Sequence, residues 1–229
     1  MTAENPAGRE GHSLAAGLAL GLIALGRGAS APALAELRIN EHLNLFISGG
    51  RYSSLNASTA PEAARRAGVG RPDSMHGAAS GMRASAGDAA ASKNSTIKED
   101  DLVNLDVTAP GAMLALALMY LQTNNEQAAR LLDLPTSLPE LEELRPDLVV
   151  IRVWARGLIM WDEVQPTPEW MLSQIPAALI RLYDPREQAA AAARGVDVAA
   201  LAMLRESIEA GLCFVWGFRF AGSAVRLGL

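Results

Sequence analysis

The sequence predicts an all-α protein, and three observations favour this fold class. Half of the 229 residues are apolar but only 5% are aromatic, so the apolar excess lies in alanine and leucine, which favour helices. Residues 111–122 (GAMLALALMYLQ) and 186–212 (REQAAAAARGVDVAALAMLRESIEAGL) are rich in alanine, leucine, methionine and glutamate. The alternating pattern of β-branched residues that marks strands is nearly absent.

The first predicted helix lies in residues 14–28 (LAAGLALGLIALGRG). Its apolar run, 14–25, has 12 residues, whereas a membrane-spanning helix needs about 20, so length excludes a membrane span. Residues 26–31 spell G-x-G-x-x-A, which leaves a remote alternative: an enzyme that binds a nucleotide through Gly26 and Gly28. That fingerprint requires a preceding strand and an acidic residue about 20 positions later, and the sequence offers neither. We therefore predict a repeat helix that buries its glycines.

The next segment, from about residue 51 to 98, is low in complexity and consists mainly of alanine, serine, glycine and arginine. Such a composition buries too little apolar surface to offset the chain entropy lost on folding. We predict one long, disordered insertion over residues 51–100, whose serines are candidate phosphate acceptors. Helical residues 1–50 precede the insertion, and helical residues 101–229 continue the same architecture.

A helix is also predicted for residues 147–162 (DLVVIRVWARGLIMWD), although this is the one patch rich in β-branched residues. The patch is too long for an ordinary strand, and it places Leu148, Ile151 and Ala155 at helical spacing. Pro146, directly before it, is a typical first residue of a helix.

An internal repeat relates three of the predicted helices. When Ala15, Gly111 and Gly211 are superimposed, two further sets of residues come into register. These sets are Gly21, Ala117 and Gly217, and then Gly26, Gln122 and Gly222. Gly157 lies in a plausible further unit between the second and third helices.

Small residues at fixed spacing indicate close helix packing, because a glycine inside a helix costs about 1 kcal/mol relative to alanine. Its repeated use on one face is favourable only where another backbone approaches closely. Each unit would then be a helix pair whose apolar face is covered by the next unit. The pattern predicts a segment of an α-helical repeat solenoid.

The sequence offers no credible active site or metal site. Cys213 is the only cysteine, and the three histidines His12, His42 and His76 fit no ligand motif. Cys213 lies in an apolar run and is expected to be buried, and the four tryptophans are expected in the core or at the interfaces between stacked repeat units. The net charge of −5 gives no general affinity for nucleic acid. We expect no enzyme activity, no cofactor, and no nucleic-acid or membrane partner.

Four stretches resemble one known family, the proteasome/cyclosome repeat region of subunit 1 of the anaphase-promoting complex. They are SLAAGLALGLIALGRGAS, NLDVTAPGAMLALALMYLQTNN, RPDLVVIRVWARGLIMWDEVQPTPEWMLSQIP and AGLCFVWGFRFAGSA, in the order that the family shows. The repeat signature alone is shared with the scaffold subunits of the proteasome regulatory particle, which remain an alternative. The second and third stretches are more specific to the anaphase-promoting complex.

The resemblance implies helix pairs closed into a toroid and a non-catalytic scaffold role in a multisubunit ubiquitin ligase of the cell cycle. It implies as partners the cullin subunit, the DOC-domain subunit, helical-repeat subunits and the β-propeller coactivator, in the nucleus and cytoplasm. This chain lacks the family's N-terminal propeller and has too few repeats to close a ring. We therefore expect it to be a fragment or a truncated gene product.

Overall fold

A computed structural model describes residues 6–30, 36–52, 55 and 102–222 of the chain. The described residues up to 50 and from 103 onward belong to one compact unit, and residues 51, 52, 55 and 102 belong to a second. In the second unit, Arg51 and Leu102 form an isolated antiparallel bridge. The rest of the predicted insertion, apart from residues 52 and 55, lies outside the described residues, so the division at 51–100 stays a prediction.

Within the described part of the chain, all regular elements are helices, which confirms the all-α class. Their bounds are α1 (Pro6–Ile23), η1 (Gly28–Ser30), α3 (Ile39–Ser48), α6 (Leu105–Met119), α7 (Glu126–Arg130), α8 (Leu138–Glu142), α9 (Pro146–Ile159), η2 (Trp161–Glu163), α10 (Pro168–Gln174), α11 (Ala177–Arg181), α12 (Pro185–Ala193) and α13 (Val198–Phe220). None of the described helices combines the length and apolar character that crossing a membrane requires.

Side chains at the helix starts explain several of these bounds. The Asn104 side chain accepts a hydrogen bond from the Asp106 amide at the start of α6 (3.1 Å), and the Asp197 side chain caps α13 in the same way. The helix predicted for residues 147–162 is confirmed as α9, which begins at Pro146 as expected. It ends three residues earlier than predicted, because Trp161–Glu163 continue as a 3₁₀ turn.

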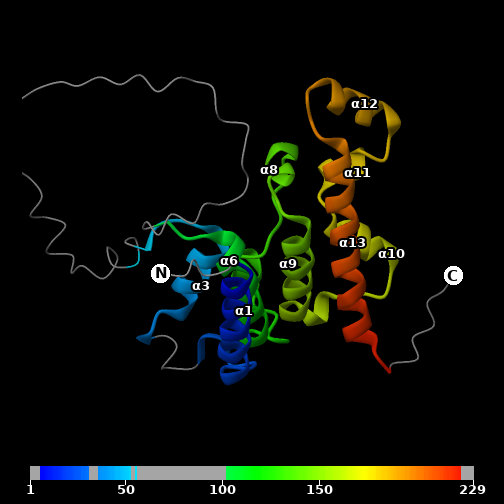
Figure 1. The fold of residues 1–229 in the computed structure, drawn as a ribbon. Helices are drawn as coiled ribbons and strands as arrows, with labels where there is room; N and C mark the ends of the chain where they lie inside the picture. Colours follow the sequence, from blue (N-terminus) through cyan, green and yellow to red (C-terminus); the bar gives the residue numbers. More distant parts are fainter. Residues whose placement is uncertain (1–5, 31–35, 53–54, 56–101, 223–229) are drawn as a thin grey trace, which may run out of the picture. The chain divides into compact units, whose positions relative to one another are not determined.

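The four long helices of the first unit pack in a row: α1 against α6, α6 against α9, and α9 against α13 (Figure 1). α3 covers another side of α6, while α8, α11 and α12 contact α13. Two buried apolar clusters follow this order, one around α6 and one around α13. α9 links the clusters, since Ala155 and Ile159 belong to the first and Val149 to the second.

Candidate functional site

The closest helix contact joins α1 to α6 through two glycines. A methyl group placed on Gly17 would collide with the carbonyl group of Gly111, and one placed on Gly111 would collide with the carbonyl of Ser13. One turn further along α1, a methyl on Gly21 would lie 2.7 Å from the Leu118 Cβ atom. The two backbones are therefore nearly in contact, as the repeat pattern predicts for Gly21 and Gly111.

A second close contact joins α9 to α13. A methyl on Gly157 would collide with the Val215 side chain, and one on Gly211 would lie 3.0 Å from the Val150 carbonyl oxygen and 3.1 Å from the Val153 Cβ atom. At both glycines the neighbouring helix lies so close that the methyl group of an alanine would push it away. Gly157, which the sequence placed in a plausible further unit, thus makes the same kind of contact as Gly111.

The predicted helix stops Gly26, Gln122 and Gly222 share a left-handed backbone, with φ values of 66°, 58° and 74°. Two of them bond to the next helix of the row: the Gly26 amide donates to the Leu118 carbonyl (3.0 Å), and the Gln122 amide donates to the Leu158 carbonyl (2.9 Å). Each of these bonds joins a helix stop to a carbonyl near the end of the neighbouring helix. The stop of each helix thereby fixes the register of its neighbour.

Asn124 strengthens the second of these links. Its backbone is also left-handed (φ 52°), and its amide donates to the Ile159 carbonyl (2.9 Å). Its side chain donates to the Asp162 carboxylate (2.7 Å) and accepts from the Asp162 amide (3.0 Å). Asparagine suits this position because it tolerates left-handed backbone and still offers both a donor and an acceptor.

Two parts of the repeat prediction are wrong within the described chain. Ala15 is exposed, and a methyl on Gly217 would meet no heavy atom within 4 Å. The reason is geometric, since residues six positions apart point about 120° away from each other around a helix of 3.6 residues per turn. Ala15 and Gly21 therefore cannot share one face. Ala117 is fully buried together with Gly111 because α6 has neighbours on several sides.

The sequence comparison of repeats missed Gly17, the residue closest to its neighbour. The available signal was its spacing of four from Gly21, which puts both glycines on one face of α1. Cys213 was expected to be buried but is exposed, because it lies on a side of α13 that no described helix covers. The rings of Trp170 and Trp216 stack on each other, with centroids 6.5 Å apart.

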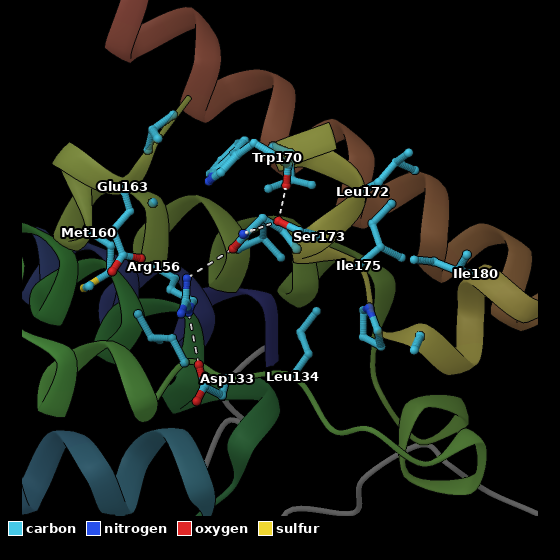
Figure 2. Close-up of a pocket in the computed structure, with 18 of the residues that line it drawn as sticks. Asp133, Leu134, Arg156, Met160, Glu163, Trp170, Leu172, Ser173, Ile175 and Ile180 are labelled. Atoms are coloured by element: carbon cyan, nitrogen blue, oxygen red, sulfur yellow. Dashed lines mark hydrogen bonds and ion pairs between the residues drawn. The ribbon is translucent and has the colours of Figure 1, made fainter. Parts of the chain in front are cut away.

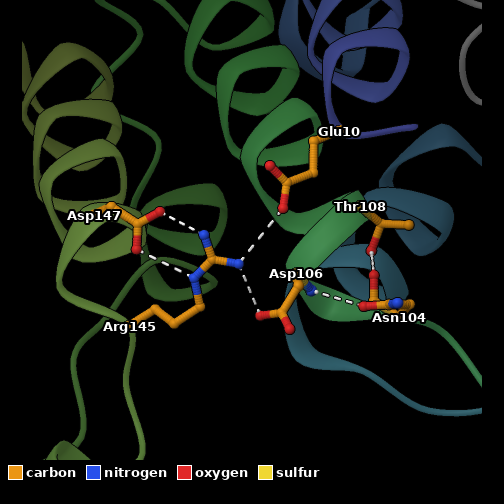
Figure 3. Close-up of polar contacts among 6 residues, drawn as sticks. All are labelled: Glu10, Asn104, Asp106, Thr108, Arg145 and Asp147. Carbon is orange, nitrogen blue, oxygen red and sulfur yellow. Dashed lines mark hydrogen bonds and ion pairs between the residues drawn. The ribbon is translucent and has the colours of Figure 1, made fainter. Parts of the chain in front are cut away.

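A polar cluster joins the starts of three helices (Figure 3). The Arg145 guanidinium bonds to both carboxylate oxygens of Asp147, at 2.6 and 3.1 Å, and lies 3.1 Å from an Asp106 oxygen and 3.7 Å from a Glu10 oxygen. The hydrogen bond from Arg145 holds the pKa of Asp147 below its ordinary value, and Asp147 in turn raises the pKa of Arg145. The arrangement holds α1, α6 and α9 together at one end.

One cavity, with a volume of about 570 Å³, lies between α9, the α10–α11 segment and the loop after α7 (Figure 2). Most of its lining is apolar, with Met160, Trp170 and Ile180 among the side chains. At its centre, Arg156 bonds to the Asp133 carboxylate (3.0 Å) and to the Gln174 side-chain oxygen (3.3 Å). The cavity is thus an apolar recess with one arginine that internal partners hold in place.

The described residues bear on two kinds of site, a metal site and a nucleotide-binding turn. Among the described residues, no group of three or more histidine, cysteine, aspartate or glutamate side chains is placed to hold a metal ion. The residues before Gly26 form the helix α1 and not a strand, and the Tyr120 ring lies 3.0 Å from the position of a methyl on Gly28. The strand that a dinucleotide-binding turn requires is therefore missing, which argues against the nucleotide-binding alternative.

Comparison with known proteins gives a consistent match. Residues 1–227 match the family described as the APC1 fifth domain. The chain is 34% identical over 216 residues to anaphase-promoting complex subunit 1 of Homo sapiens, a match that covers 94% of this chain and 10% of the human protein. It is 34% identical over 224 residues to the subunit of the same name from Arabidopsis thaliana, covering 96% of this chain and 11% of that protein. It is also 30% identical over 215 residues to an Emericella nidulans protein named negative regulator of mitosis, covering 93% of this chain and 8% of that protein. The chain thus spans about a tenth of the length of these relatives.

Proposed function

The chain belongs to the APC1 fifth domain family of anaphase-promoting complex subunit 1, and from this we propose that it is a non-catalytic scaffold segment of that subunit. The match of residues 1–227, nearly the whole chain, carries the proposal. In this role the segment contributes helix surfaces that position other subunits of a ubiquitin ligase controlling mitotic progression. Its own side chains take no part in ubiquitin transfer.

We propose further that the row of helices is a piece of a repeat solenoid. Each long helix contacts its neighbours along the row, as expected where stability is shared between adjacent units. Both ends of the row present apolar side chains to solvent: Leu22 of α1 is 54% exposed, and Phe214 and Phe218 of α13 are 56% and 55% exposed. Such surfaces support a continuation of the helical row in a protein about ten times longer.

The proposed partners follow from the family. They are the cullin, DOC-domain and helical-repeat subunits of the complex and its β-propeller coactivator, met in the nucleus and cytoplasm. Nucleic acid and membrane are not among them, in line with the net charge of −5.

Native purification of the full-length protein that contains this segment tests the proposal. With an affinity tag on that protein, mass spectrometry should identify cullin and RING subunits in stoichiometric amounts. Recovery of ATPase-ring subunits in their place would reject the proposal and favour a proteasome regulatory-particle scaffold. A rise in the melting temperature of the chain with millimolar nicotinamide or adenine nucleotide would instead favour the enzyme alternative built on Gly26 and Gly28.

A further inference from the structure

We propose that the 570 Å³ cavity is a docking site for a peptide segment of a partner protein, one that carries a large apolar side chain next to a lysine or arginine. The proposal names one surface that the proposed scaffold would use and in that respect rests on the scaffold role. Its evidence is the shape, rigidity and charge of the cavity itself.

The apolar part of the site comes from two walls that face each other (Figure 2). α9 contributes Val153, and Met160 directly follows this helix, while the α10–α11 segment contributes Leu172, Ile175 and Ile180. The volume lies within the range of about 300–1,000 Å³ that is usual for ligand pockets. Leu172 is 48% exposed at the rim, so part of this apolar surface already faces solvent. An apolar side chain of a partner would cover it.

The base of the cavity is rigid before any ligand enters. Arg156 is held by Asp133 on one side and by Gln174 on the other. The Gln174 amide donates to the Ser173 hydroxyl (3.0 Å), which donates to the Trp170 carbonyl (2.6 Å). This chain of bonds links α9 to α10 and fixes the cavity walls, so binding would cost little conformational entropy.

The charge of the lining indicates which polar group accompanies the apolar one. The Arg156 guanidinium is offset by the Asp133 carboxylate 3.0 Å away. This pairing leaves Glu163 as the uncompensated charge, and its carboxylate has no hydrogen-bond or ion-pair partner among the described residues. The Trp170 ring, which stacks on Trp216, adds apolar surface to the same lining. A lysine or arginine fits these groups, whereas an acidic side chain would face repulsion.

The test measures binding of labelled peptides to the purified 229-residue chain by fluorescence anisotropy. The probe is a fluorescein-labelled hexapeptide with two adjacent leucines followed by lysine. Its two controls have norleucine or glutamate in place of the lysine. We expect saturable binding of the lysine peptide that is roughly two- to fivefold tighter than binding of the norleucine peptide, the range of an exposed ion pair. The glutamate peptide should bind most weakly.

Two pairs of variants locate the site. Glu163→Gln should abolish the preference for lysine, whereas Glu169→Gln, an exposed change on α10 outside the lining, should keep it. Leu172→Asp should weaken all three peptides, whereas Ile23→Asp, an exposed apolar change on α1, should not. All four residues are exposed, so the variants should keep the helical circular dichroism of the parent chain.

The proposal is overturned if the lysine peptide shows no saturable binding, if the glutamate peptide binds equally well, or if the two members of either pair behave alike. The assay uses the chain without other subunits. Loss of the scaffold role in native purification would therefore leave the peptide result intact, and failure of peptide binding would leave the scaffold role intact.

Discussion

Replacing Gly17 with alanine should destabilise the fold, while the same change at Gly11 in the same helix should stabilise it. Both residues lie inside α1 (Pro6–Ile23). A methyl on Gly11 would meet nothing within 4 Å, so Gly11→Ala should gain about 1 kcal/mol from helix propensity alone. The methyl of Gly17→Ala would collide with the Gly111 carbonyl group, which belongs to the main chain of α6.

The magnitude at Gly17 follows from two opposing effects. Overpacking a tight contact costs about 1–3 kcal/mol, and the upper end applies because relief requires α1 to move away from α6 as a whole. Subtracting the propensity gain of about 1 kcal/mol leaves a net loss of about 2 kcal/mol for Gly17→Ala. The two variants should therefore differ in unfolding free energy by about 3 kcal/mol.

Urea unfolding followed by circular dichroism at 222 nm measures this difference. With a denaturant slope of about 2 kcal/mol/M, the midpoint should fall by about 1 M for Gly17→Ala and rise by about 0.5 M for Gly11→Ala. A midpoint for Gly17→Ala at or above that of the parent chain would show that α1 and α6 are not in backbone contact. The close-packing argument for every glycine of the row would then fail.

Three other predictions follow from the same contacts. Gly157→Leu should lower the unfolding free energy by several kcal/mol, because the added side chain would collide with Val215. Gly217→Leu should change it by less than about 1 kcal/mol, because Gly217 has no neighbour within 4 Å among the described residues. Equal urea midpoints for the two variants would contradict this. Asp147→Asn should make the stability of the folded chain less sensitive to acid. The lowered pKa of Asp147 means that its carboxylate stabilises the fold above the ordinary carboxyl pKa, and that this stabilisation is lost as pH falls through the lowered pKa. The asparagine variant has no such contribution to lose. Melting temperatures measured from about pH 5 down to pH 2 should therefore drop less in the variant than in the parent. Asn124→Ala should lower the unfolding free energy by about 2 kcal/mol, because it loses the bonds to Asp162 and strains the left-handed backbone. Asn124→Gly should lower it by about half as much, because glycine loses the same bonds but adopts left-handed backbone without strain. Thermal melts that rank the two variants in reverse would refute this.

The sequence was sufficient for the fold class and for the start of α9, because helix propensity and the position of Pro146 are local properties. It also aligned Gly26, Gln122 and Gly222, which share a left-handed backbone although one of them is glutamine. Local sequence carries this signal because the left-handed residue that ends a helix is a local feature of the backbone.

The partners of each glycine could not be predicted, since they depend on which helices flank a given position. Gly111 and Gly211 align in the repeat, yet the first faces the Ser13 backbone and the second faces side chains and a carbonyl of α9. The cavity has no sequence signature at all. Its lining comes from segments between Leu132 and Leu212, and no motif brings Asp133, Arg156 and Glu163 together.

Gly217 supports the proposed continuation of the row of helices. A glycine inside a helix lowers helix stability, and no close contact in the described chain compensates for this at Gly217. Each interior helical glycine forfeits about 1 kcal/mol relative to alanine. At Gly17, Gly111 and Gly157 this loss of helix propensity is offset, because only glycine allows the neighbouring helix to come so close. Gly217 bears the same loss beside the exposed Phe214 and faces open space. A glycine is favourable there if another helix of the longer protein approaches α13 closely. Gly217→Ala should then stabilise the isolated chain by up to about 1 kcal/mol. The same substitution should lower the melting temperature of the full-length subunit, because the added methyl would collide with the approaching helix. Stabilisation in both would argue that the row ends at α13.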